Sequence, residues 1–395
     1  MTMAAGTRDV PKVSVWNDPK VRAVFFQAAL LAVLLFLLYE IVHNTIANLH
    51  RLGKGFGYGF LSQTAGFDII QRLIDYSSSS TYGRALEVGL LNTILIAVVS
   101  IATATIIGFT VGIMRLSSNW IVSRVATVYI EFFRNIPLLL QIFFWYNFVV
   151  IQSLPELKQA VSVGGLFFLS KKGFMFPAPV FGEGGWMGLV GLALAIVAII
   201  IMVPWAKARL VSTGKPFPVF WASIGLLILL PLLGLALAGF PVTWDVPQKT
   251  AFNFRGGAAM IPEMMALYLA LSIYHATYIA EAVRAGVQSV NKGQTEAANA
   301  LGLRSGPTLR HVVIPQAMRV VIPPLASTYM NLTKNSSLAV GIGYPDLVAV
   351  GGTVLNQTGK AIEIVSIWML VYGSLSLLTS LLMNWFNSRM KLVER

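Results

Sequence analysis

The stretch Asn291–Pro315, NKGQTEAANALGLRSGPTLRHVVIP, is polar and lies between two long apolar parts of the chain. Asn291 is followed three residues later by Gln294, which resembles the capping pattern at the start of a helix. Residues 294–301 are good helix formers, and Gly302 stands where a left-handed helix stop is expected. The stretch therefore predicts a short helix that ends at a glycine-centred bend.

A second short helix is predicted after this bend. Ser305 is a suitable cap, and Pro307 falls in the first turn, where proline is tolerated because its missing N–H is not needed. Pro315 is expected to end this helix, and the Pro323-Pro324 pair to mark the entry to the next apolar run. Residues 281–323 are thus predicted to form a polar loop with two short helices at a membrane surface.

The rest of the composition is that of an integral membrane protein. Of the 395 residues, 56% are hydrophobic and 11% are charged, whereas soluble domains carry about 25% charged residues. The mean hydropathy is +0.72, and a soluble fold has no place to bury so much apolar surface. The chain has no cysteine, which excludes disulfides and cysteine-ligated metals. We expect an all-α membrane protein.

A helix needs about 20 apolar residues to cross a bilayer. Strand-like alternation is lacking, which argues against a β-barrel. The first apolar stretch is interpreted as a retained anchor, because no small-residue cleavage site follows it closely. About eight transmembrane helices are predicted, namely Ala23–Tyr39, Val88–Met114, Val125–Val150, Met187–Val203, Val219–Phe240, Met264–Ala280, Pro324–Gly343 and Ile364–Phe386.

Basic residues indicate the orientation of these spans. With both termini inside, the inside segments carry more Lys and Arg than the outside segments, as the positive-inside rule requires. Residues 1–22 are then a cytoplasmic tail, 23–42 a first membrane helix and 43–85 a periplasmic loop. The net charge of +13 is attributed to this orientation and not to nucleic-acid binding.

The motifs of the common enzyme classes are missing from the sequence. Gly214-Lys215-Pro216 and Gly359-Lys360-Ala361 both lack the Ser or Thr that completes a phosphate-binding loop. The His-Glu-x2-His zinc motif and the Gly-x-Ser-x-Gly hydrolase motif do not occur. We therefore assign no catalytic residue, no metal ligand and no cofactor to this chain.

Charged residues inside the predicted spans mark candidate functional positions, because charge is costly in hydrocarbon. Glu131 and Arg134 are three residues apart, and we favour a local ion pair over a role in a substrate path. For Lys334 two interpretations stay open: a substrate-lining role, and an internal salt bridge with Glu131 as the suggested partner. Its polar neighbours are Asn331, Thr333, Asn335, Ser336 and Ser337.

Gly108 and Gly112 form a small-x3-small pair in the second span. Such a pair lets two helices approach closely. We favour packing within the chain over a dimer contact.

The polar loop resembles the EAA loop of ABC importer permeases. Glu296-Ala297-Ala298 is followed after three residues by Gly302, and nine residues later by Val312-Val313-Ile314-Pro315. The resemblance implies a coupling helix, in which Ala297 and Ala298 enter a cleft on a separate ATPase. Gly302 would allow the sharp bend that follows.

Three further stretches resemble the polar-amino-acid (His/Gln/Arg-type) permeases: Glu131–Gln141, Tyr278–Gly286 and Asn331–Leu338. That subfamily has the type I ABC importer fold with a five-helix core. Here the core corresponds to the second, third, sixth, seventh and eighth spans within 86–395. The first span and the two spans inserted at 153–258 are additional, as in the general L-amino-acid permeases of the AapQ/BztB type.

This resemblance implies a permease subunit that moves amino acids across a bacterial inner membrane by alternating access. Expected partners are ATPase subunits that hold ATP and Mg, a second homologous permease, a periplasmic binding protein and membrane lipid. Independently of the resemblance, the charge and depth of Lys334 suggest that it meets a substrate α-carboxylate, with Asn335 and Ser336 supplying hydrogen bonds. Asn331 and Gln141 are expected near the path. The alternative is an ion-gradient-driven transporter with Glu131, Arg134 and Lys334 as a relay.

Overall fold

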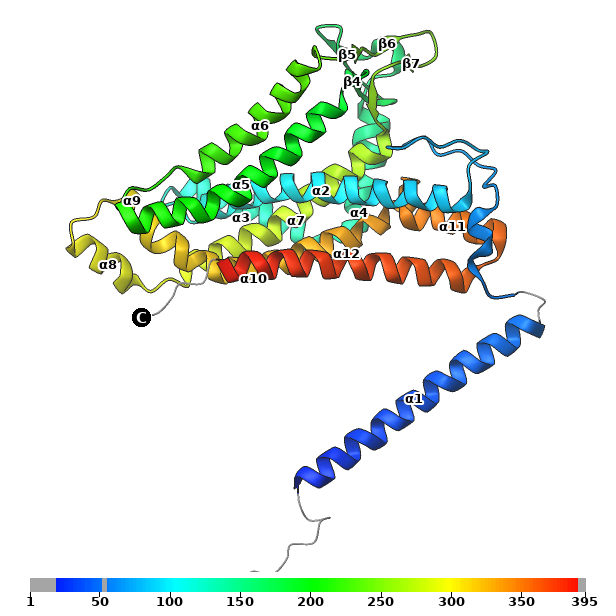
Figure 1. Cartoon of the computed structure of the whole chain (residues 1–395), viewed down its shortest axis with the longest axis horizontal. Helices are drawn as coiled ribbons and strands as arrows, with labels where there is room; N and C mark the ends of the chain where they lie inside the picture. The colour runs from blue at the N-terminus through cyan, green and yellow to red at the C-terminus, as the bar shows by residue number, and fades with distance from the viewer. Residues whose placement is uncertain (1–18, 52–54, 390–395) are drawn as a thin grey trace, which may run out of the picture.

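The structure, a computed structural model, describes residues 19–51 and 55–389. Long helices lie side by side along one axis, α8 and α9 lie at one end of them, and α11 lies at the other (Figure 1). The helices are α1 Pro19–Arg51, α2 Tyr82–Arg115, α3 Trp120–Asn135, α4 Leu138–Phe144, α5 Trp186–Thr213, α6 Val219–Leu237, α7 Pro262–Gln288, α8 Lys292–Ala300, α9 Ser305–Thr308, α10 Ile314–Asn335, α11 Leu347–Thr358 and α12 Ala361–Arg389.

Helix α7 is at the centre of the bundle and packs against α2 on one side and α10 on the other. Glycines make both contacts close. A Cβ atom at Gly112 would lie 2.8 Å from the carbonyl oxygen of Ala280, and one at Gly286 would lie 2.9 Å from that of Ala317. Gly108 likewise faces α7. The prediction that Gly108 and Gly112 serve packing within the chain is confirmed.

The third predicted span, Val125–Val150, is not one continuous helix. The chain bends by 100° between α3 and Leu138–Ser153, which comprises α4 and the π-helical turn Trp145–Ser153. Ile136 adopts an extended conformation, as residues before a proline do, and Pro137 has no N–H to continue the ladder. A single straight span was therefore the wrong expectation here.

The seventh span begins about one helical turn after α9 and not at Pro324. The π-helical turn Leu309–Val313 joins α9 directly to α10, and the 3-10 turn Ser336–Ile342 extends it to a 53° bend before α11. Pro315 therefore does not end the second helix, and both Pro323 and Pro324 lie inside α10. The wide turn before Pro315 gives its ring room against the preceding carbonyls, which explains why the helix continues.

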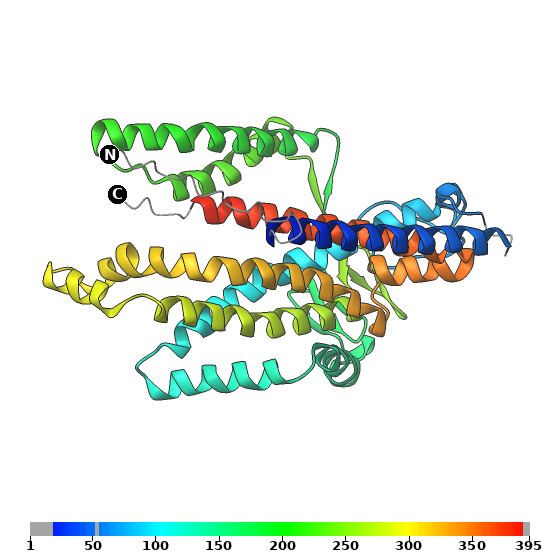
Figure 2. The same ribbon diagram turned by 90° about the horizontal axis from the view of Figure 1, so that it is seen from below.

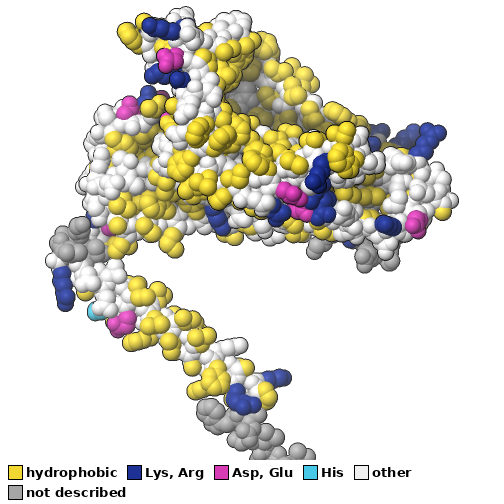
Figure 3. Space-filling model, turned by 180° about the vertical axis from the view of Figure 1, so that it is seen from behind, with side chains coloured by type: hydrophobic (Ala, Val, Ile, Leu, Met, Phe, Trp, Pro, Cys, Tyr) yellow, Lys and Arg dark blue, Asp and Glu magenta, His cyan; other side chains and the backbone are white. Residues whose placement is uncertain are grey.

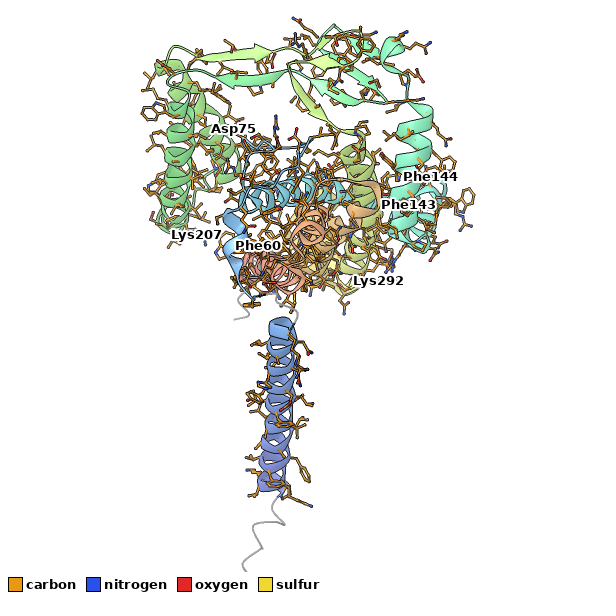
Figure 4. The ribbon with its side chains drawn as sticks, turned by 90° about the vertical axis from the view of Figure 1, so that its right-hand side faces the viewer. Phe60, Asp75, Phe143, Phe144, Lys207 and Lys292 are labelled. Carbon is orange, nitrogen blue, oxygen red and sulfur yellow. The ribbon has the colours of Figure 1, made fainter. Side chains whose placement is uncertain are left out.

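The inserted region contains short strands as well as its two helices. Strands β1 Val161–Val163, β2 Phe167–Ser170, β3 Gly173–Phe176 and β8 Ala258–Met260 form an antiparallel sheet in that order. Two small ladders pair β4 Ala178–Phe181 with β5 Val242–Asp245, and β6 Gln248–Lys249 with β7 Phe254–Arg255. These strands were not predicted; they connect the α4 side of the molecule with α5 and α6 (Figure 4).

The α5–α6 hairpin packs on itself and stands apart from the bundle (Figure 2). Its own contact is very close, because a Cβ atom at Gly191 would lie 2.3 Å from the carbonyl oxygen of Leu230. No residue of α6 is buried. The face of the molecule drawn in Figure 3 carries many hydrophobic side chains, as expected for contact with lipid.

Five helices are long and apolar enough to cross a membrane: α1, α2, α5, α6 and α12. Counting each bent pair as one span gives up to seven in the described part of the chain. The expected sixth span lies in α7, a deeply buried helix with several polar residues. Helix α1 is longer than predicted and projects from the body (Figure 1), and the predicted tail lies almost wholly outside the described residues.

Replacing Gly112 with Leu should destabilise the bundle by about 1–3 kcal/mol, because the added side chain forces α2 away from α7. Thermal unfolding of the purified protein in detergent measures this effect. The matched control is Gly373→Leu in α12, where a Cβ atom meets nothing within 4 Å. Equal unfolding temperatures for the two variants would contradict the packing role.

Candidate functional site

Helix α8 begins and ends as the sequence predicts. The Asn291 side chain accepts a hydrogen bond from the Gly293 N–H at 2.8 Å. At the other end Gly302 has a φ of 74°, and the Leu303 N–H donates to the Ala298 carbonyl at 3.1 Å, which is the Schellman arrangement. Gln294 does not close a capping box; its side chain accepts from Gln316 of α10 at 3.4 Å and ties α8 to that helix.

The exposed face of α8 differs in one residue from the predicted face. Glu296 and Ala297 are exposed, whereas Ala298 is only 4% exposed because it packs against the chain itself. The expectation that Ala298 enters a partner's cleft is therefore wrong in this conformation. Leu301 is 81% exposed and, with Ala297 and Ala300, forms the apolar surface that α8 offers.

An ion-pair cluster stabilises the end of the bundle beneath α8. Glu281, one residue past the predicted sixth span, bonds to Arg115 of α2 and to Arg284. The hydrogen bonds from Arg284 hold the pKa of Glu281 below its ordinary value. The cluster thus fixes α2 to α7 where α7 leads into α8.

A polar cavity of about 270 Å³ lies between α7 and α10. Asn335 and His275 join the two helices across it, with 3.2 Å between the Asn335 Nδ2 and the His275 Nε2. The His275 Nδ1 lies 2.9 Å from the Leu271 carbonyl, so this nitrogen is the donor and Nε2 accepts from the amide. The lining residues are Tyr274, His275, Tyr278, Thr328, Asn331 and Asn335.

Arg134 of α3 contacts Tyr278, one of the residues that line this cavity. Its guanidinium lies 4.7 Å from the centre of the Tyr278 ring, a cation–π contact. Glu131 is exposed, and none of the ion pairs found between described residues involves it. The predicted Glu131–Arg134 pair is therefore wrong, and so is the suggested pair of Glu131 with Lys334.

The comparisons with known proteins agree with this architecture. Residues 207–392 match the family "Binding-protein-dependent transport system inner membrane component". The general L-amino acid transport system permease protein AapQ of Rhizobium johnstonii is 53% identical over 382 residues, covering 97% of this chain and 95% of AapQ. This chain belongs to the amino-acid ABC transporter permeases.

Two further relatives support the assignment. The putative amino-acid ABC transporter permease protein YhdX of Escherichia coli is 48% identical and covers 96% of both chains. The glutamate/glutamine/aspartate/asparagine transport system permease protein BztB of Rhodobacter capsulatus is 42% identical and also covers 96% of both. The chain is thus a multi-pass membrane subunit with the type I ABC importer fold, and it is not the ATPase. Nothing supports the ion-gradient alternative.

The predicted site residues of the permease do not all converge. Asn331 and Asn335 line the cavity, but Lys334 is exposed beside it and Ser336 is buried, with its hydroxyl donating to the Thr333 carbonyl. Consecutive residues of a helix point in different directions, so Lys334, Asn335 and Ser336 do not meet one ligand. The expectation that these three residues bind one ligand together is therefore wrong.

Gln141 does not line the cavity either. It is buried at the break between α3 and α4, where its amide Nε2 donates to the Phe133 carbonyl at 2.7 Å and to the Ile136 carbonyl at 2.9 Å. A bend in a membrane helix frees carbonyls that lipid cannot satisfy. Gln141 supplies the missing donors from within the chain.

Sequence reasoning missed four cavity residues of the permease: Tyr274, His275, Tyr278 and Thr328. A signal was present for three of them. Tyr274 and Tyr278 are four residues apart with His275 between them, so they share a face of an otherwise apolar span. Thr328 carries no such signal, because single threonines are common in helices.

Replacing Gln141 with Leu should destabilise the permease by about 1–3 kcal/mol, because two carbonyls at the bend lose their donor. Thermal unfolding in detergent measures the loss. The control is Gln152→Leu, the same change at an exposed position. A Gln141→Leu protein as stable as this control would show that the bend does not need the amide.

Proposed function

We propose that this permease imports polar L-amino acids into the cytoplasm and that α8 couples the movement to a separate ATPase. The observation that carries the proposal is the continuous helical path from α9 to the cavity. Ser305 begins a helix that runs without a break through α10, which carries Asn331 and Asn335. A displacement of α8 would thereby be transmitted through α10 to the residues that line the cavity.

The geometry of α8 supports its role as a docking element. It lies at one extreme end of the molecule, beyond the bundle (Figure 1). Glu296, Ala297 and Leu301 are exposed there, and the Gly302 stop fixes their direction. We propose that these residues enter a cleft on the ATPase, which holds ATP and Mg. Pro315 would hold the start of α10 in a fixed direction relative to α8.

The chemistry of the cavity suits an amino acid. The Arg134 guanidinium provides a positive charge for an α-carboxylate, and the amides of Asn331 and Asn335 both donate and accept hydrogen bonds. No carboxylate is among the lining residues found in the described chain. We propose that the substrate path of this subunit passes through the cavity, with Lys334 at its margin.

The exposed faces of the bundle support two further partners, a second permease and a periplasmic binding protein. Figure 2 shows α10 on an open face of the bundle, clear of the hairpin. Val320 of α10 and Val340 of the 3-10 turn that follows it are exposed. We propose that a second, homologous permease covers this face and that a periplasmic binding protein delivers the amino acid. The α5–α6 turn, α8 and the end of α12 lie at the same end (Figure 1), which fits cytoplasmic termini.

Replacing Gly302 with Val should lower amino-acid uptake at least tenfold. A β-branched residue with a left-handed backbone costs about 1–2 kcal/mol, so α8 and its exposed face lose their fixed direction. Uptake of radiolabelled amino acid into proteoliposomes with the ATPase and binding protein measures this. Gly302→Asn is the control, because asparagine tolerates this conformation. Normal uptake by Gly302→Val would count against coupling through α8.

Replacing Asn335 with Leu should lower uptake about tenfold, while ATP hydrolysis without substrate continues. The change removes the bridge to His275 and one polar wall of the cavity. Asn384→Leu in α12 is the control, since Asn384 is exposed and far along another helix. Equal uptake by the two variants would exclude the cavity from the path but leave the coupling role of α8 intact.

A further inference from the structure

We propose that the α5–α6 hairpin binds the headgroup of an anionic phospholipid at its turn, through Lys207, Arg209 and Lys215 held beside an aromatic platform. This site is separate from the cavity and from α8, and it does not depend on the proposed transport cycle. The hairpin stands away from the bundle, so lipid is its natural surrounding (Figures 2 and 4).

The depth of the site follows from the tryptophans of α5. Trp186 and Trp205 are both exposed, and they are separated by about 28 Å at 1.5 Å per residue. This distance is close to the thickness of the hydrocarbon core, about 30 Å. Tryptophan prefers the two membrane interfaces. Lys207 and Arg209 come two and four residues after Trp205 and therefore lie at the level of lipid headgroups.

The aromatic platform orients one of the cations. Trp205 and Phe217 meet edge to face, with their ring centres 5.2 Å apart, although they belong to the two sides of the turn. The Arg209 guanidinium lies 5.5 Å from the Trp205 ring and 5.8 Å from the Phe217 ring. The rings hold its plane while its N–H groups remain free for an acceptor.

The three cations lack an anionic partner within the described protein. None of the ion pairs found there includes Lys207, Arg209 or Lys215. Gly214, with a φ of 68°, turns the chain so that Lys215 follows closely on the end of α5. Figure 4 places Lys207 on the hairpin, away from the other helices. A phosphate group with a negative charge is the complementary chemistry at this depth.

The positive-inside rule also places basic residues in such a turn and could account for these three without any bound lipid. That rule counts Lys and Arg and takes no account of neighbouring aromatic rings. A lipid site, in contrast, depends on Trp205 and Phe217 as well as on charge. A topology signal should therefore be unaffected when the aromatic residues are replaced without a change of charge, whereas a lipid site should be weakened.

Native mass spectrometry of the full chain in detergent, with added phosphatidylglycerol or phosphatidylcholine, tests the proposal. The wild-type protein should retain phosphatidylglycerol about a hundredfold better. Replacing Lys207, Arg209 and Lys215 together with Gln should abolish this preference, since each cation near an anionic headgroup contributes roughly fivefold. The control removes the same charge elsewhere, by Lys158→Gln, Lys172→Gln and Lys249→Gln. An unchanged preference in the first triple variant would overturn the proposal.

The aromatic platform is tested without any change of charge. Trp205→Leu with Phe217→Leu should weaken phosphatidylglycerol retention several-fold. Phe220→Leu with Trp221→Leu should not, because these exposed rings lie at the same interface but make no cation–π contact with any arginine that the structure describes. Equal retention of phosphatidylglycerol by the two double variants would show that the turn is only a topology signal. That result would overturn the proposal.

Two further measurements distinguish a lipid site from a small-anion site and from a topology signal. Inorganic phosphate at millimolar concentration should not displace the lipid; displacement would indicate a site for small anions and contradict the proposal. The chain has no cysteine, so Ser212→Cys gives a single label at the turn. Labelling with an impermeant maleimide should be the same in all variants; an inverted turn would show that the charges act on topology alone.

Discussion

The close approach of three helix backbones is the constraint on which this permease depends. Helix α7 lies against α2 at Gly108 and Gly112 and against α10 at Gly286, where a Cβ atom would collide with side chains and carbonyl oxygens of the neighbouring helix. In a membrane the hydrophobic effect does not drive helices together, so contact area must come from such close packing. The ion pairs of Glu281 add polar contacts at one end of the interface between α2 and α7.

The second constraint is that lipid satisfies no backbone hydrogen bond. The described part of the permease nevertheless contains a 100° bend and two π-helical turns. Gln141 donates hydrogen bonds to the carbonyls that the bend leaves free. The wide turn Leu309–Val313 allows the helix to continue through Pro315 into α10. The break between α3 and α4 places Arg134 beside Tyr278, and the unbroken α10 places Asn331 and Asn335 across from His275. The cavity is therefore a product of where helices break and where they do not.

The insertion adds a different kind of surface to this core. Its strands lead to a hairpin that touches the bundle little and is apolar on nearly every side. Such a hairpin needs lipid contacts to fix its depth, and its aromatic residues and cations are distributed accordingly. The core is thus stabilised by packing between its helices, whereas the position of the hairpin is set by the bilayer.

The sequence alone determined the membrane class, most of the spans, the Gly302 stop of α8 and the family, because these depend on composition, local capping and a contiguous motif. It did not determine the cavity. Asn331 and Asn335 were found among polar neighbours, but Lys334, Ser336 and Gln141 were grouped with them because sequence proximity does not say which way a side chain points. Pro315 was misjudged for a related reason: whether a proline ends a helix depends on the turn before it. His275, Tyr278 and Arg134 meet only because α3, α7 and α10 pack together, and such contacts between distant residues exist only in the folded chain.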